Sequence, residues 1–428
     1  MEEIVAKHDV HGSRLAYELT RRRFLQGSAL AGFSAFLAAC TGSNSSQAPS
    51  AAATTASSAA PTPVPSVNPT PVPSPTGPLK WAQWPAYIDL TGKAGEEGAY
   101  APGSSPTIEE FKKQYKVEVD YEEKVEDNQV FYATIQPQLQ AGAPTGWDMI
   151  TVTDWLAAKI IGKGWAEKID QATVPNCVAN LRDALKNQAW DPTQDYHYPW
   201  QSGVAGIGYN SKVLKGAGHA EPKSLKDLWA LPANRLSFLT EVRDTFGLGL
   251  LKLGKDPDPA KVTADDLQAV FDDIKPLVDK GLIFADNSYL KNFAAKKTWA
   301  AMVWSGDLAS SGTEGDTFVY PEEGSILFTD NMLIPKGATN KYTAELMMNF
   351  CYDPKIAGQI ANYVYYVSPV KGAEEVLKEL NKDAPLDAYL LNLLFPTEDL
   401  VAKQHSFQFL SDELEQKMNE LYLTLTGA

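Results

Sequence analysis

The chain has few of the residues that build metal or redox sites. Its 428 residues include three cysteines and five histidines. Among the histidines beyond residue 39, which are His197, His219 and His405, no H-x-x-H or H-E-x-x-H spacing occurs, and no C-x-x-C is present. We therefore do not expect a zinc or iron site built on imidazole or thiolate.

Catalytic signatures are also missing. No G-x-S-x-G elbow, Walker loop or G-x-G-x-x-G follows an expected strand. Acyl transfer, nucleotide hydrolysis and dinucleotide chemistry therefore lack their usual sequence marks, and we expect neither an enzyme nor a cofactor. An exported enzyme remains the most distant alternative.

No apolar run is long enough for a membrane helix. The longest candidate, residues 27–39, is about a dozen residues, whereas a bilayer needs roughly 20. It follows the basic segment T-R-R-R-F-L-Q and ends in L-A-A-C at Cys40. The first motif resembles a twin-arginine export signal and the second a lipoprotein cleavage box. We expect a signal peptide over residues 1–39 and lipid on Cys40; a buried amphipathic helix is the alternative.

Residues 40–78 follow the expected lipid attachment site as a linker. From residue 43 the segment is rich in Ser, Ala, Thr and Pro and includes P-T-P-V-P. That composition cannot bury a core, and its prolines favour an extended spacer that reaches about 100 Å at most. The linker would hold a folded part away from the membrane.

Positive charge is in deficit. The formal net charge is −15, and an acidic surface repels nucleic acid and anionic lipid while it attracts cationic partners. Plain solubility explains the same charge. With 44% hydrophobic residues, the part after the linker can form two medium lobes.

Strand-like and helical runs alternate after residue 79. This rhythm predicts an α/β fold with mainly parallel sheets. The expected strands are 80–87, 117–121, 148–152, 204–210, 300–304 and 327–334. The expected helices are 108–115, 156–161, 225–229, 344–351, 356–363 and 412–425.

Aromatic residues recur at the expected strand ends beside acids or turn residues. Examples are Trp84 with Tyr87, Trp304 before Ser-Gly, and Phe328 with Asp330. Ligands of α/β sheets bind beyond the carboxyl ends of strands, and ring faces attract ammonium groups. Each aromatic has a simpler explanation as core, and the acids near residue 241 could serve a helix start.

Two cysteines remain if Cys40 carries lipid. Cys177 and Cys351 could form one disulfide in an oxidising compartment, or be two small buried residues. We favour two buried thiols.

A resemblance to a known family covers residues 79 to 426. It is carried by W-x-x-Y at 84–87, W-D-M-I-T-V-T-D-W at 147–155, K-I-D at 168–170, D-P-T-Q-D-Y-H-Y-P-W at 191–200, G-I-G-Y-N at 206–210, L-T-E-V-R-D-T-F at 239–246, A-M-V-W-S-G at 301–306 and Y-P-E-E-G-S-I-L-F-T-D at 320–330. In this order the motifs resemble the spermidine/putrescine-binding proteins of ABC-type polyamine importers.

The resemblance implies a set of ligand-binding residues. Aromatic side chains would box the methylene chain, carboxylates would hold the ammonium ends, and two polar side chains would assist. The matching positions are Trp84, Tyr87, Trp155, Trp304, Phe328 and Tyr366 for the rings, Glu241, Asp244 and Asp330 for the acids, and Thr153 and Gln408 for the polar contacts. Phe328 stands where the family usually has tryptophan, and Trp155 where it usually has tyrosine.

The resemblance also implies architecture and partners. We expect a two-lobed type II periplasmic-binding-protein fold with crossover strands and a hinge that closes on the ligand. One lobe would be 79–203 plus 329–372, and the other 204–328 plus 373–428. The expected protein is a monomeric, extracytoplasmic lipoprotein that passes a polyamine to an ABC permease and binds no nucleic acid. The same fold binding a sugar or betaine is the alternative.

Overall fold

The structure is a computed structural model, and it describes residues 73–91, 103–311 and 314–427. The expected signal peptide, Cys40 and the linker up to residue 72 lie outside the described residues. Within these ranges no helix combines the length and the apolar character that crossing a bilayer would require.

One mixed sheet runs through the described part of the chain. Its order is β2-β1-β3-β9-β4-β7-β5-β6, with β10 paired to β9 and β8 to β4. The strands are β1 (Leu79–Gln83), β2 (Val119–Glu123), β3 (Met149–Thr153), β4 (His197–Asn210), β5 (Leu236–Leu239), β6 (Ile283–Ala285), β7 (Ala300–Trp304), β8 (Asp316–Val319), β9 (Ser325–Leu333) and β10 (Gln404–Ser406).

The expectation of mainly parallel pairing is wrong at the centre of the sheet. Strands β1, β2 and β3 pair in parallel at one side, and β5, β6 and β7 pair in parallel at the other. Between them lie the long strands β4 and β9, which are antiparallel to each other and to β7 and β3. Two crossing strands therefore join two parallel halves, a relationship that strand-helix alternation does not reveal.

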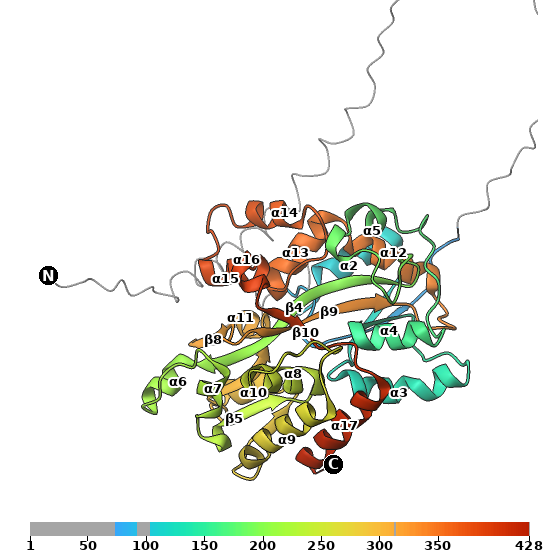
Figure 1. The fold of residues 1–428 in the computed structure, drawn as a ribbon. Coiled ribbons are helices and arrows are strands. Elements are labelled where there is room, and N and C mark those ends of the chain that lie inside the picture. Colours follow the sequence, from blue (N-terminus) through green and yellow to red (C-terminus); the bar gives the residue numbers. More distant parts are fainter. Residues whose placement is uncertain (1–72, 92–102, 312–313, 428) are drawn as a thin grey trace, which may run out of the picture.

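Helices cover both halves (Figure 1). Around one end of the molecule lie α5, α12, α13 and α14, and around the other lie α8, α9 and α17. The helices are α2 (Pro106–Tyr115), α3 (Asn128–Gln140), α4 (Asp154–Gly162), α5 (Pro175–Asn180), α6 (Ser211–Gly216), α7 (Leu225–Trp229), α8 (Val242–Lys252), α9 (Ala264–Val278), α10 (Tyr289–Ala294), α11 (Asp307–Ser311), α12 (Lys341–Cys351), α13 (Pro354–Val364), α14 (Ala373–Leu380), α15 (Ala388–Leu394), α16 (Glu398–Val401) and α17 (Asp412–Thr426), with short 3₁₀ turns at Asp183–Leu185 and Ala233–Arg235.

Strand β4 is longer than the sequence predicts. It begins at His197 rather than residue 204, and every one of its 14 residues is buried. Its early part contains Pro199, which cannot donate to a sheet ladder, and the register with β9 shifts between Pro199 and Gln201. Because a proline is uncommon inside a strand, the sequence does not predict the first half of β4. The shift in register with β9 lets the strand accommodate Pro199.

Strand β1 is shorter than the sequence predicts: it ends at Gln83, and the chain turns at Pro85 and Ala86. Ala86 has a φ of 56°, in the left-handed region that non-glycine residues seldom adopt. Its N–H donates to Glu123 at 2.8 Å. The turn carries Trp84 and Tyr87 out of the sheet at the carboxyl end of β1.

The lobe boundaries expected from the resemblance stay a proposal. Asn381, just after α14, donates to Asn362 of α13 at 2.8 Å, although these residues were assigned to different lobes. The hydroxyl of Tyr389 in α15 accepts from the N–H of Phe318 in β8. We therefore propose that the second lobe resumes between α14 and α15 rather than at residue 373.

Cys177 and Cys351 are free and buried. Burial raises the pKa of both thiols. The structure thus agrees with two buried thiols rather than one disulfide.

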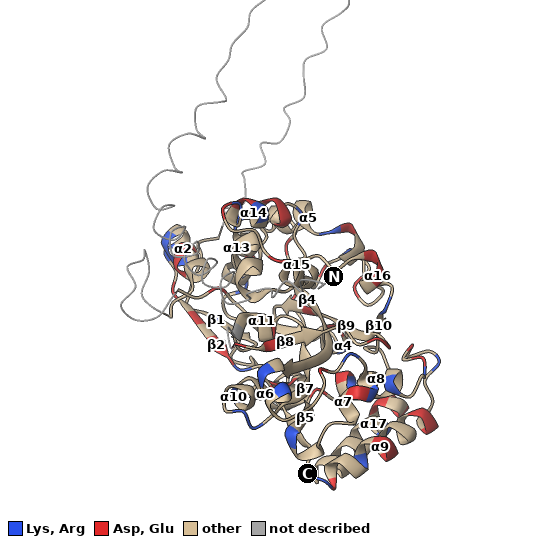
Figure 2. Cartoon of the chain, turned by 90° about the vertical axis from the view of Figure 1, so that its left-hand side faces the viewer, with Lys and Arg blue, Asp and Glu red and all other residues tan. Residues whose placement is uncertain are grey.

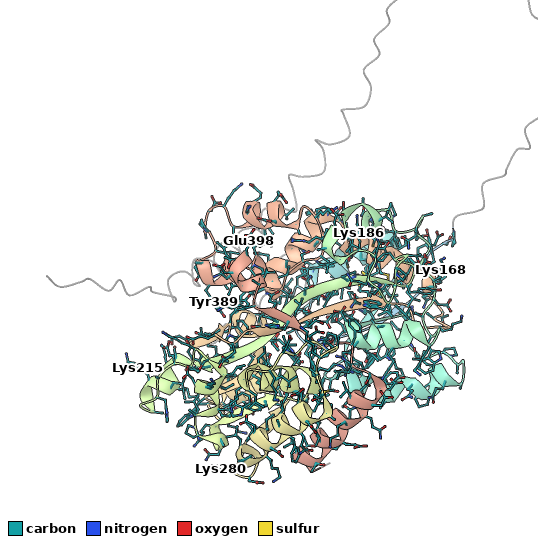
Figure 3. The ribbon with its side chains drawn as sticks, in the orientation of Figure 1. Lys168, Lys186, Lys215, Lys280, Tyr389 and Glu398 are labelled. Atoms are coloured by element: carbon teal, nitrogen blue, oxygen red, sulfur yellow. The ribbon has the colours of Figure 1, made fainter. Side chains whose placement is uncertain are left out.

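Charged side chains lie mostly on the outside of the molecule. Figure 2 shows Asp and Glu over outer helices such as α9 and α17, and Figure 3 places Lys168, Lys186, Lys215 and Lys280 at the periphery. A few carboxylates lie buried near the middle of the molecule, and these define the site.

Candidate functional site

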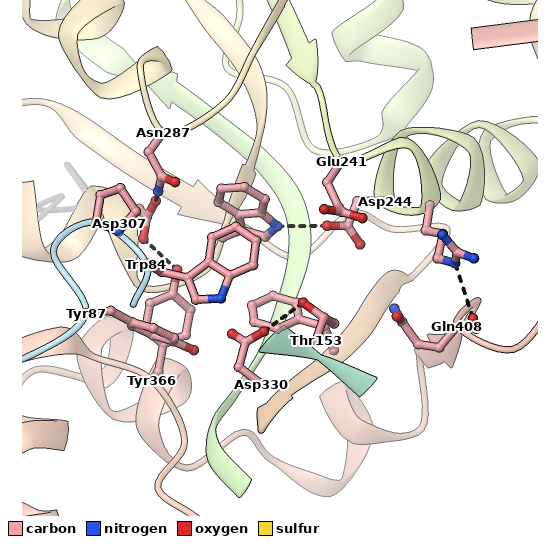
Figure 4. A pocket seen from close by; sticks show the side chains of 14 residues that line it. Trp84, Tyr87, Thr153, Glu241, Asp244, Asn287, Asp307, Asp330, Tyr366 and Gln408 are labelled. Carbon is pink, nitrogen blue, oxygen red and sulfur yellow. Dashed lines mark hydrogen bonds between the residues drawn. The ribbon is translucent and has the colours of Figure 1, made fainter. Parts of the chain in front are cut away.

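A pocket of about 450 Å³, including open solvent at its mouth, lies between the two halves of the sheet (Figure 4). Its walls come from the carboxyl ends of β1, β3, β5 and β7 and from the middle of β9, as expected for an α/β sheet. The lining residues are Trp84, Pro85, Tyr87, Thr153, Glu241, Arg243, Asp244, Asn287, Trp304, Asp307, Phe328, Asp330, Tyr366 and Gln408.

Ten of the eleven ligand-binding positions implied by the resemblance are therefore gathered in one place. The exception is Trp155, a buried residue in the first turn of α4 that is not part of the pocket lining. The residues come from segments as far apart as 84 and 408, so only the tertiary structure brings them together.

Aromatic rings form the walls around Trp84 and Tyr87. Trp84 meets Trp304 edge to face, with ring centroids 5.9 Å apart. Tyr366 lies 5.1 Å from Tyr87 and 6.1 Å from Phe328, again in T-shaped contacts. Because such pairs fix each other's orientation, the rings present a stiff apolar surface to whatever enters.

Two carboxylates stand at the start of α8. Glu241 is the residue that precedes the helix, and Asp244 lies in its first turn. Trp304 donates its indole N–H to Asp244 at 2.8 Å (Figure 4). Burial, with the charges of Asp127 and Asp244, raises the pKa of Glu241 to about 8. Burial likewise raises the pKa of Asp244 to about 7.

A third carboxylate, Asp330, projects from the crossing strand β9. Its Oδ1 accepts a hydrogen bond from the Thr153 hydroxyl at 2.7 Å, and burial raises its pKa to about 7. The pKa values of the three acids are raised mainly because burial disfavours their charged form, an effect that the nearby Arg243 only partly offsets at Glu241 and Asp244.

A fourth acid, Asp307, was missed in the sequence. It begins α11 and accepts hydrogen bonds from the hydroxyls of Tyr366, at 2.6 Å, and Tyr289, and from Asn287 at 3.1 Å. Burial raises its pKa. The signal was present, because Asp307 follows the W-S-G segment that places Trp304.

Arg243 is the single cationic residue of the pocket lining. Its guanidinium pairs with Glu415 at 3.0 Å, and its Nε donates to the backbone carbonyl of Gln408 at 3.2 Å. It lies over the ring of Trp155, 3.7 Å from the centroid. Trp155 therefore supports the pocket through Arg243 instead of lining it.

No metal site accompanies these acids. Across the ranges given above, no group of three or more His, Cys, Asp or Glu side chains is arranged to hold a metal ion. The arrangement suits a ligand that carries its own positive charge.

Comparison with known proteins agrees with this geometry. The family model described as bacterial extracellular solute-binding protein matches residues 107–388. A spermidine/putrescine-binding periplasmic protein of Haemophilus influenzae is 25% identical over 305 residues, which are 70% of this chain and 79% of the relative. The spermidine/putrescine-binding periplasmic protein of Escherichia coli is 28% identical over 280 residues, 63% of this chain and 75% of the relative.

Solved structures share the fold. A putative spermidine/putrescine ABC transporter protein from Listeria monocytogenes superposes with a TM-score of 0.64 at 24% identity, covering 82% of this chain and 99% of that one. The substrate-binding protein PotD of Streptococcus pneumoniae gives 0.62 at 22% identity, covering 83% and 99%. The fold is that of a type II periplasmic binding protein, as expected, and the chain belongs to the bacterial extracellular solute-binding protein family.

Proposed function

We propose that this protein captures a polyamine, spermidine or putrescine, outside the cytoplasm and delivers it to an ABC transporter permease. One observation carries the proposal. Four buried carboxylates, Glu241, Asp244, Asp307 and Asp330, share a pocket with five aromatic rings, whereas its one arginine is paired with Glu415 outside the lining.

This combination suits a linear polycation. The ring faces would pack along the methylene chain and attract the ammonium groups. Each ammonium group would gain at least one carboxylate partner, and the carboxylates nearest to it would gain a positive charge in place of the water that burial removes. The relatives named for spermidine and putrescine support the same ligand class.

The family and the N-terminal sequence support a proposal on location. We propose export by the twin-arginine route, lipid on Cys40, anchorage in the cell membrane with the linker as spacer, and a monomer that binds solute without catalysis. Replacing Cys40 with serine should release the mature protein from the membrane fraction without changing its affinity for the solute. Release without this substitution would contradict the anchor.

The ligand can be tested by calorimetry and thermal shift with putrescine and spermidine. We expect saturable heat and a higher melting temperature, because a ligand that binds only the folded state stabilises it. Asp330→Asn should weaken binding by more than about 100-fold, since removing one partner of a buried charge pair costs roughly 3 to 5 kcal/mol.

A matched control separates local from general charge effects. Asp120→Asn removes one acid from the exposed face of β2 and should leave the affinity unchanged. If neither amine gives heat with the wild type while a neutral sugar saturates it, polyamine binding is wrong.

A zwitterion such as betaine is the second candidate, and one observation favours it. Within the described ranges, Nη1 of Arg243 is buried without a hydrogen-bond partner, and it could donate to a ligand carboxylate. Arg243→Met would then abolish binding of the zwitterion, whereas binding of a diamine would weaken only modestly, through the lost support behind the pocket.

A further inference from the structure

Asn128 is a fully buried polar residue just behind the pocket. It is the first residue of α3, directly after Asp127, whose carboxylate accepts from the N–H of Val130 and caps the helix. Its side chain is not part of the pocket lining, and nothing in the sequence singles it out.

Asn128 binds one oxygen of the pocket acid Glu241. The backbone N–H and the side-chain Nδ2 of Asn128 both donate to Oε2, at 3.2 and 3.0 Å. The other oxygen, Oε1, is buried and has no partner among the residues described. One oxygen of Glu241 is thus held in place while the other is left for a ligand.

The same asparagine is bonded to the opposite side of the pocket. Its Nδ2 also donates to the Thr153 hydroxyl at 2.9 Å, and its Oδ1 accepts from the Thr153 N–H at 3.2 Å. The Thr153 hydroxyl in turn donates to Asp330 at 2.7 Å (Figure 4). The Asn128 amide therefore acts on two carboxylates: it donates directly to Glu241, and it donates to the Thr153 hydroxyl, which in turn donates to Asp330.

The bonds to Glu241 join the two halves of the molecule. Glu241 follows β5 in one half, whereas Thr153 ends β3 in the other and is linked to Asn128 by two hydrogen bonds. The Asn128–Glu241 contact therefore requires both halves to stand close together. Burial raises the pKa of Glu241, and the hydrogen bond from Asn128 opposes that rise.

We propose that Asn128 is a positioning residue that couples the approach of the two halves to the orientation of Glu241 and Asp330, and so prolongs the lifetime of the bound amine. The proposal rests on the proposed function for its ligand, whereas the hydrogen bonds of Asn128 are present without a ligand.

Asn128→Ala and Asn128→Asp test the proposal when titrated with putrescine and spermidine. Without the Asn128 amide, Glu241 and Asp330 lose the hydrogen bonds that orient them, so Asn128→Ala should raise Kd about tenfold, mainly through faster release. Asn128→Asp keeps the shape, cannot donate when ionised and repels Glu241, so its Kd should rise about 100-fold. Because the new carboxylate is buried beside Glu241, Asn128→Asp should also lower the melting temperature without ligand, so Kd and release rates are compared at a temperature at which both variants are folded.

Asn176→Ala is the matched control. Asn176 is partly buried, bonds to Asn349 at 2.7 and 3.0 Å and lies away from the pocket. The Asn176→Ala variant should lower the melting temperature without changing the rate of amine release, which is measured by stopped-flow tryptophan fluorescence.

The order of the two Asn128 variants decides between positioning and packing. If Asn128 only fills space, the isosteric aspartate variant would bind the amine better than the alanine variant, and that order would overturn the proposal. Release rates within twofold of the wild type would also overturn it.

If the wild type binds neither amine, the proposed function fails instead. The variants would then be titrated with whichever of betaine, 4-aminobutyrate or maltose raises the wild-type melting temperature, and equal affinities would overturn the positioning role. A wild type that responds to no solute in this set overturns both.

Discussion

The guanidinium of Arg243 lies 3.7 Å from the ring centroid of Trp155, and the same guanidinium pairs with Glu415 at 3.0 Å. Lys159 of α4 donates to the other oxygen of Glu415 at 2.5 Å. Since α17, which carries Glu415, also packs on α8 and α9, these contacts support the pocket from behind.

Trp155→Leu should weaken amine binding only modestly. The cation–π contact contributes roughly 1 to 2 kcal/mol to the folded protein with or without ligand, so most of its loss should appear as a lower melting temperature, and Kd should rise at most about fivefold by calorimetry. Trp304→Leu is the comparison, because Trp304 lines the pocket and donates to Asp244. This variant should lose more affinity for the amine than Trp155→Leu. The reverse order would place Trp155 at the ligand.

Glu415→Gln should destabilise the fold. It leaves Arg243, which is 1% exposed, with no carboxylate partner in this ion pair, and such uncompensated burial costs about 3 kcal/mol of unfolding free energy. Urea denaturation without ligand measures the change. Asp279→Asn breaks the exposed pair with Lys275 and should change little. Equal effects from both variants would contradict a buried role for Glu415.

The ligand-free protein should lose stability as the pH rises from about 5 to 8. Burial raises the pKa of Glu241 to about 8 and that of Asp244 and Asp330 to about 7, so in this window the folded state holds more protons than the unfolded state. Stability then falls with rising pH. Melting temperatures across this window check the sign, and a triple variant that combines Glu241→Gln, Asp244→Asn and Asp330→Asn should flatten the profile.

Amine binding should release protons at pH 7. Ammonium groups beside these carboxylates lower their pKa values, so binding is coupled to proton loss and affinity rises with pH until the free acids are ionised. Calorimetry in buffers of different ionisation enthalpy measures the release. Binding heat that is independent of buffer would show that the pocket acids are already ionised before the ligand arrives.

The two described cysteines should stay unreactive in the folded state. Cys177 is fully buried, Cys351 is 3% exposed, and burial raises the pKa of both thiols. A thiol reagent should label both only after denaturation, and a reductant should not change the melting temperature. A reductant-sensitive melting temperature would indicate a disulfide.

Local sequence patterns predicted many elements well. Helix α7 and strand β7 have the predicted bounds, and α17 extends the predicted range by one residue, because apolar spacing and capping residues act over a few positions. Strand β4 was half missed, since its first part contains a proline and a glycine whose cost is offset by pairing with the distant β9.

The sequence by itself determined the alternating elements, the acidic charge, the export-type N-terminus and the residue types that suit a cationic ligand, because each depends on composition or on neighbouring residues. Only the tertiary structure decided that Asp307 and Arg243 join the pocket, that Trp155 stands behind it, and that Asn128 links Glu241 to Thr153. These contacts join residues far apart in the chain, and the pairing of the crossing strands sets their distances.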